Sequence, residues 1–109
     1  MRFASEEPRF RGLNARAALE HVRSGRIDVN ATDGDASLLT FACEHGAEPL
    51  LNTILDAPEL QIDQSNGKGE TALALALRSS NDVLVQTLLH KGANIRPQLH
   101  ELRARGFLP

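Results

Sequence analysis

The chain contains an internal repeat with a period of 34 residues, and this repeat restricts the fold more than any other feature of the sequence. Small and apolar residues coincide when residues 37–55 are shifted onto residues 71–89. A period of about 20 to 50 residues is typical of units that stack because none of them can bury its apolar face alone. The coinciding pairs are Ser37 with Thr71, Leu39 with Leu73, Phe41 with Leu75, Ala42 with Ala76, Leu51 with Val85, Ile54 with Leu88 and Leu55 with Leu89.

Each copy is predicted to form two short helices. The run ALALAL at residues 72–77 alternates like a strand, yet alanine and leucine favour helices and none of the six residues is β-branched. Thr71 can cap this helix, and Asn81 or Asp82 can cap a second helix that ends at Gly92. The apolar face of the second helix comprises Leu84, Val85, Leu88 and Leu89.

The earlier copy and the two ends of the chain predict further helices. In the earlier copy they cover residues 37–46 and 50–56, with Pro49 in a first turn, where a missing N–H is tolerated. Residues 14–24 and 97–106 predict an amphipathic helix at either end of the chain. We interpret these two helices as caps, because a stack of repeats exposes an apolar face at each end unless a capping unit covers it.

The C-terminal cap is expected to begin at Pro97 and to end at Gly106, with Leu99 and Leu102 pointing inward and Arg103 and Arg105 pointing outward. At 109 residues the chain is predicted to be one domain. Its units are an N-terminal capping unit at residues 1–31, repeats at residues 32–65 and 66–96, and a C-terminal capping helix at residues 97–109.

The two copies resemble the repeat of the ankyrin-repeat family. In that family a turn of the form D-x-x-G-x-T-P-L-H leads into the first helix, A-A-x-x-G-H ends it, and V-V-x-x-L-L-x-x-G-A-D-V-N closes the unit. The later copy matches at Asn66, Gly69, Thr71, Leu73, Ala76, Leu84, Val85, Leu88, Leu89, Gly92, Ala93, Asn94 and Ile95. The earlier copy matches at Ser37, Leu39, Ala42, Cys43, Gly46, Leu50, Leu51, Ile54, Leu55 and Ile62.

The resemblance implies an all-α, ankyrin-like solenoid of stacked helix-turn-helix repeats with short hairpin-like loops, about two full repeats standing between the two caps. The sequence departs from the family at the T-P-L-H signature, which reads SLLT at residues 37–40 and TALA at residues 71–74. Proline and histidine are both missing, so the hydrogen bonds that the family builds from this histidine are not expected in their usual form.

Charge is distributed unevenly along the chain. Residues 1–26 hold six arginines and three glutamates, whereas residues 27–70 hold nine acidic residues and a single basic one, Lys68. Two interpretations stay open. The charges either solvate an irregular stack, or they form an acidic central surface that steers a partner with a basic surface.

The sequence contains no signal for a membrane or for export. No stretch approaches the roughly 18 to 20 apolar residues of a membrane span, and MRFASEEPRFR lacks the apolar core of a signal peptide. Cys43 is the single cysteine and has no disulfide partner within the chain. We expect a cytoplasmic protein, and we interpret ten arginines against two lysines as typical of a bacterial genome.

No catalytic site, metal site or cofactor is expected. Cys43 takes the place of a small core alanine in the family, so a packed thiol is favoured over a nucleophile. The motif Gly67-Lys68-Gly69 lacks the spacing of a phosphate loop, and Asp33 and Asp35 are predicted to be turn residues. The histidines lack the paired spacing of zinc sites. Nucleic acid is not an expected partner, because only four aromatic residues, all phenylalanines, are available for stacking on bases and the acidic middle of the chain repels phosphate.

A protein-binding surface is the remaining prediction. In ankyrin-like proteins the turn tips and the outer residues of each first helix line one concave side. Phe41 and Leu75 lie near this side and are expected to pack inside the protein. The residues predicted to contact a partner are Gly34, Asp35, Ala36, Glu44 and His45 in one unit, and Gly67, Lys68, Glu70, Arg78 and Ser79 in the next.

Two classes of function remain open at this point. The first is a non-catalytic protein-binding module, monomeric when free, that acts as an adaptor or an inhibitor, such as a bacterial effector or a toxin-neutralising (immunity-type) protein. The second is a structural segment that associates with further copies or further repeats through its ends. The apolar residues that motivate the second class are Phe3, Phe10, Phe107 and Leu108.

Overall fold

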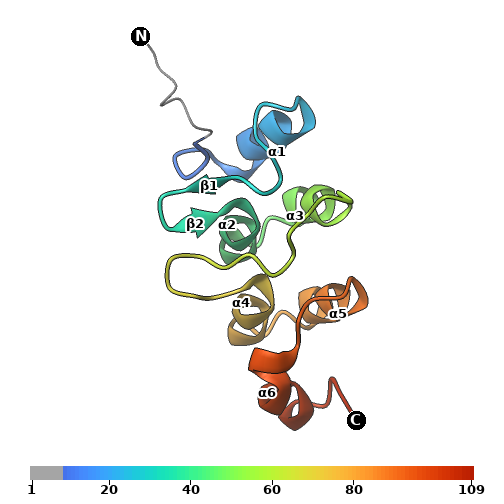
Figure 1. Cartoon of the computed structure of the whole chain (residues 1–109). Coiled ribbons are helices and arrows are strands. Elements are labelled where there is room, and N and C mark those ends of the chain that lie inside the picture. The colour runs from blue at the N-terminus through green and yellow to red at the C-terminus, as the bar shows by residue number, and fades with distance from the viewer. Residues whose placement is uncertain (1–8) are drawn as a thin grey trace.

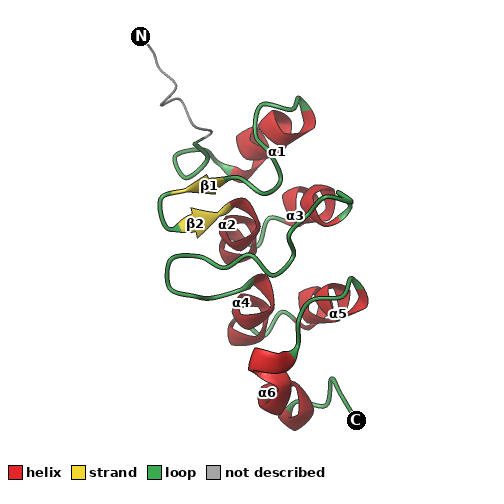
Figure 2. Cartoon of the chain, in the orientation of Figure 1, coloured by secondary structure: helices red, strands yellow, loops and turns green. Residues whose placement is uncertain are grey.

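A computed structural model describes residues 9–109 and shows a helix-rich chain with six α-helices (Figures 1 and 2). Phe3 lies outside the described residues, as does the start of the predicted N-terminal capping unit. The helices are α1 (Ala15–Arg23), α2 (Leu38–His45), α3 (Glu48–Leu55), α4 (Ala72–Arg78), α5 (Asp82–His90) and α6 (Leu99–Ala104), with a 3-10 turn, η1 (Arg96–Gln98), before α6. Two short strands, β1 (Thr32–Asp33) and β2 (Ala36–Ser37), precede α2.

The helices lie in two rows. Figure 1 shows α1, α3 and α5 in one row and α2, α4 and α6 in the other, with the turns on the side of α2 and α4 that faces away from the first row. α1 packs against α3, α2 packs against both α3 and α4, and α4 packs against α5. The chain measures 54 by 24 by 22 Å, so the helix pairs follow one another along its long axis. None of the helices within residues 9–109 combines the length and the hydropathy that a bilayer span requires.

The helix boundaries confirm the 34-residue period. α2 and α4 begin 34 residues apart, at Leu38 and Ala72, and α3 and α5 begin 34 residues apart, at Glu48 and Asp82. The alternating run ALALAL is helical, as its composition predicted, because Thr71 caps it by accepting a hydrogen bond from the Ala74 N–H. The Asn81 side chain caps α5 in the same way.

A buried pair of hydroxyl residues replaces the missing histidine of the earlier copy. The Ser37 hydroxyl accepts from the Thr40 N–H, and the Thr40 hydroxyl accepts from the Ser37 N–H at 3.1 Å. This capping box satisfies two donors at the start of α2, and both side chains are fully buried. The later copy has Ala74 at the equivalent position, so only the Thr71 hydroxyl is available there.

The two repeat turns differ in their hydrogen bonding. The first is a two-residue hairpin in which Thr32 pairs with Ser37 and Asp33 pairs with Ala36, so the all-α prediction omitted a short β-ladder. The second turn contains no strand within the described residues. It is closed by Asn66, whose side-chain oxygen accepts from the N–H groups of Lys68 and Glu70, both at 2.9 Å.

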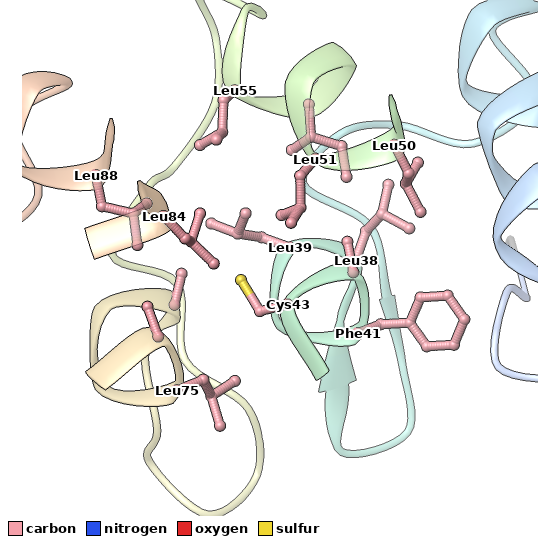
Figure 3. Packing of buried hydrophobic residues seen from close by; sticks show 14 of the residues in the cluster. Leu38, Leu39, Phe41, Cys43, Leu50, Leu51, Leu55, Leu75, Leu84 and Leu88 are labelled. Carbon is pink, nitrogen blue, oxygen red and sulfur yellow. The ribbon is translucent and has the colours of Figure 1, made fainter. Parts of the chain in front are cut away.

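One contiguous hydrophobic core runs through the repeats (Figure 3). Phe41 and Leu75 are buried in it, as predicted. Phe10 is fully buried as well and meets the Phe41 ring edge-on at 5.1 Å between centroids. The expectation that Phe10 supplies an exposed apolar end is therefore wrong, because its ring packs against Phe41 of α2.

The C-terminal cap shows two details that the sequence did not predict. Pro97 lies in the 3-10 turn, and the regular helix α6 begins at Leu99. Arg105 is exposed, as predicted, but its guanidinium also donates to the Leu77 carbonyl oxygen at 2.7 Å and pairs with Glu101. Carbonyl groups in the last turn of α4 lack helical partners and attract a cation, which explains this contact.

Candidate protein-binding surface

The ten residues predicted to contact a partner lie in four places on the row of α2 and α4. The turn before α2 carries Gly34, Asp35 and Ala36, and the turn before α4 carries Gly67, Lys68 and Glu70. The ends of the two helices carry Glu44 with His45, and Arg78 with Ser79. All are exposed except Ala36 and Glu70, which are half-buried.

The two turns lie in direct contact. The Gly67 N–H donates to the Asp35 carbonyl oxygen, which joins the tip of one turn to the tip of the next. A β-carbon at residue 67 would lie 2.7 Å from Cγ of Asp35 and 2.8 Å from its Cβ, closer than side chains pack. A glycine at this position therefore permits the close approach of the two turns.

Gly67→Ala is expected to destabilise the protein by about 1 to 3 kcal/mol, because the new methyl group overlaps the short Asp35 side chain. Urea unfolding followed by circular dichroism measures this loss. Gly12→Ala is the matched control, since no atom lies within 4 Å of its would-be β-carbon, and we expect its effect to stay within about 0.5 kcal/mol. Equal effects of the two changes would contradict the role of the turn contact.

A shallow groove of about 210 Å³ separates the ends of α2 and α4. Three of the ten predicted residues line it, namely Glu44, Arg78 and Ser79. The remaining lining comes from the buried residues Cys43 and Leu75. The groove thus offers a narrow apolar floor between an exposed acid and an exposed base.

Arg78 is not available as an unpaired charge. Its guanidinium forms an ion pair and hydrogen bond with the Glu70 carboxylate, which also accepts from the Asn66 side chain at 2.9 Å. The Asn66 hydrogen bond, together with Arg78, lowers the pKa of Glu70 from its usual value. Two of the predicted contact residues therefore neutralise each other and brace the second turn against α4.

His45 is also partly engaged within the protein. Its ring lies against the Phe41 ring at 4.3 Å between centroids, and Nδ1 lies 3.1 Å from the Phe41 carbonyl oxygen. This contact places the imidazole at the end of α2. His45 can still contact a partner through the exposed edge of its ring.

The Cys43 thiol is packed in the core, with 9% of the residue exposed. Burial, together with the nearby Glu44 carboxylate, raises the pKa of Cys43 to about 12. A nucleophilic cysteine needs a lowered pKa, so this environment opposes the formation of a thiolate at neutral pH. Within residues 9–109, no group of three or more His, Cys, Asp and Glu side chains is arranged to hold a metal ion.

Most of the acidic side chains in residues 27–70 form hydrogen bonds or ion pairs that stabilise loops. The Asp33 carboxylate accepts from the N–H groups of Phe10 and Arg11, and Asp56 pairs with Lys91. Of the nine central acids, five accept such a bond: Asp28, Asp33, Asp56, Asp63 and Glu70. This distribution favours the interpretation that most of the acids support the local structure.

Sequence reasoning missed a recurring hydrogen bond between consecutive loops. The Asn30 side-chain oxygen accepts from the Gln61 N–H at 2.7 Å, and the Asp63 carboxylate accepts from the Asn94 N–H at 2.8 Å. Each bond spans 31 residues and joins one loop to the next loop. Asn30 and Asp63 could have indicated these bonds in the sequence, since each loop has a side chain with an oxygen that can accept from a backbone N–H.

The chain is similar over part of its length to one curated plant protein. Over 75 residues, or 69% of the chain, it is 33% identical to the E3 ubiquitin-protein ligase KEG of Arabidopsis thaliana. The chain spans about 5% of the length of that protein. This partial, distant similarity hints at ankyrin repeats in the chain. No protein-family model and no solved structure matches the chain.

Proposed function

We propose that the chain is an ankyrin-type, solenoid-forming repeat module that binds another protein as an adaptor or an inhibitor, without catalysing a reaction. The binding surface would consist of the two repeat turns and the ends of α2 and α4. The observation that carries the proposal is the contact between Asp35 and Gly67, which makes one continuous surface of two consecutive turns. Loops held in this way on a rigid scaffold are a common protein-binding device.

A partner with a basic surface fits this module best. Asp35 and Glu44 are exposed on the surface, and neither takes part in an ion pair within the described part of the chain. The Glu70–Arg78 pair contributes no net charge, which leaves Lys68 as the one cation of the ten predicted residues that has no ion-pair partner among residues 9–109. Charge of this kind influences the association rate and the choice of partner more than the affinity.

Self-association through the ends of the chain is less well supported. Phe10 is buried, and Phe107 and Leu108 are half-buried, so these residues offer little apolar surface to a second copy. Both ends are also rich in exposed arginine, and like charges oppose head-to-end stacking. The exposed arginines are Arg9, Arg11, Arg16, Arg23 and Arg26 at one end and Arg96, Arg103 and Arg105 at the other.

A capture experiment with two charge-exchange variants tests the proposal. Glu44→Lys combined with Lys68→Glu reverses two exposed charges of the proposed surface and keeps the net charge constant. Glu59→Lys combined with Arg103→Glu is the matched control, because both residues are exposed and neither belongs to the turns or the groove. We expect the wild type and the control to retain the same protein from a lysate of the host organism and the first variant to retain at least about tenfold less.

Circular dichroism and a urea transition confirm that each variant is folded as the wild type is. Retention of the same protein by all three forms would place the binding surface elsewhere on the module. A concentration-dependent mass of the free wild type in light scattering, with no retained protein, would favour the self-associating role.

A further inference from the structure

A second groove lies on the opposite row of helices, between α1 and α3. Its volume is about 590 Å³, within the range of about 300 to 1,000 Å³ that is typical of ligand-binding clefts. Figure 1 shows α1 and α3 in the row that faces away from the turns, so this groove is distinct from the surface of the proposed function. Its lining comprises Ala15, Arg16, Leu19, Glu20 and Arg23 from α1, and Ala47, Pro49 and Leu50 from the start of α3.

The internal repeat supplies a comparison for this groove. The equivalent groove between α3 and α5 has a volume of about 170 Å³. Residues at equivalent positions in the two grooves are found by counting from the N-cap residue of each helix, which is Asn14 in α1, Ala47 in α3 and Asn81 in α5. On this count Ala15 corresponds to Glu48, Leu19 to Asn52 and Ala47 to Asn81. The α1–α3 groove thus has apolar residues at three positions where the α3–α5 groove has polar ones, and the α1–α3 groove is the larger of the two.

Two arginines stand beside the apolar part of the α1–α3 groove. Arg16 and Arg23 are exposed and lie seven residues apart on α1, which corresponds to about 10 Å along the helix. Neither arginine belongs to an ion pair among residues 9–109, although Glu20 lies between them on α1. The lining carries a net positive charge, because Arg16 and Arg23 outnumber Glu20.

We propose that the α1–α3 groove binds an acidic amphipathic helix of a partner protein. Apolar side chains of that helix would enter the groove over Leu19, Ala47 and Leu50. Two carboxylates about two helical turns apart would pair with Arg16 and Arg23, since arginine binds carboxylates with directed hydrogen bonds. A helix that inserts its apolar face into a groove is a recurring mode of peptide recognition, and the charges determine which helices fit.

A peptide library tests this inference directly. Displayed random peptides of about 15 residues, long enough to form a helix, are selected on the full-length protein. We expect the enriched peptides to combine an apolar face with two acidic residues about seven positions apart. Fluorescence anisotropy with the best peptide then gives dissociation constants for the wild type and the variants.

Four variants make the result decisive. Arg16→Gln with Arg23→Gln should weaken the selected peptide at least about tenfold, whereas Arg96→Gln with Arg103→Gln, the matched control at the other basic end, should leave it unchanged. Leu19→Asn copies the residue of the smaller groove and should also weaken binding. The Glu44→Lys, Lys68→Glu variant should bind the peptide normally, so failure of this inference is distinguishable from failure of the proposed function.

Three outcomes would overturn the inference. Selection could yield no peptide above background, or peptides that bind equally well to the form lacking Arg16 and Arg23. Alternatively, the wild type could dimerise in light scattering and the form lacking both arginines remain monomeric, in which case a second copy and not a partner helix occupies the groove.

Discussion

Leu39→Ala is expected to destabilise the protein by about 2 to 5 kcal/mol, because it leaves a cavity between α2 and the helices that pack against it. Leu39 is 1% exposed and belongs to α2, which packs against both α3 and α4 (Figure 3). Domains of this size have a free energy of unfolding of only about 5 to 15 kcal/mol, so the loss is a large fraction of the total. Urea unfolding monitored by circular dichroism measures the difference between variant and wild type.

The matched control for Leu39→Ala is Val83→Ala. Val83 is 74% exposed at the start of α5, so its truncation should change the free energy of unfolding by no more than about 0.5 kcal/mol. If both variants lowered the free energy of unfolding by the same small amount, the two rows of helices would not pack around α2 in solution as described.

The Cys43 thiol is expected to react with iodoacetamide at pH 8 at least about a hundredfold more slowly in the native protein than in urea-unfolded protein. A pKa near 12, compared with the ordinary 9.0, reduces the thiolate fraction about a thousandfold. The greater intrinsic nucleophilicity of a high-pKa thiolate recovers part of this factor, and burial of the sulfur opposes reaction further. Mass spectrometry of samples quenched over time gives both rates.

The same thiol makes stability depend on pH. The pKa of Cys43 is raised on folding, so the folded state holds its proton more tightly and this stabilisation is complete below about pH 9. It is lost as the pH rises from about 9 toward 12. Cys43→Ala removes the group, and its unfolding free energy should fall less steeply over this range than that of the wild type. Fast native alkylation at pH 8, or parallel pH curves for the two proteins, would show that Cys43 is accessible.

The helices were predictable from the sequence because their determinants are local. Thr71 and Asn81 cap helices whose apolar residues recur at helical spacing, and the 34-residue shift carries that prediction from one copy to the other. The ten candidate contact residues lie on the turns and helix ends, and their contact with a partner stays a prediction. Comparing the two copies of the repeat cannot show which of these residues already form ion pairs or hydrogen bonds within the protein.

What the sequence did not reveal depends on contacts between distant residues. The pairing of Arg78 with Glu70, the burial of Phe10 and the reach of Arg105 to the Leu77 carbonyl all require the packed structure. The same holds for the larger volume of the α1–α3 groove, since small residues in a helix do not by themselves show how far the neighbouring helix stands away.

The loop bonds made by Asn30 and Asp63 bear on how such a chain could grow or shrink. Each bond joins a side chain of one loop to a backbone N–H of the next, and a backbone N–H is present whatever the side chain there. A duplicated unit inserted between the two repeats would therefore contain its own acceptor side chain, and the backbone N–H of the next loop would serve as the donor. For this loop contact, a change in the number of units requires only one asparagine or aspartate per loop, so the same bond can form at every junction.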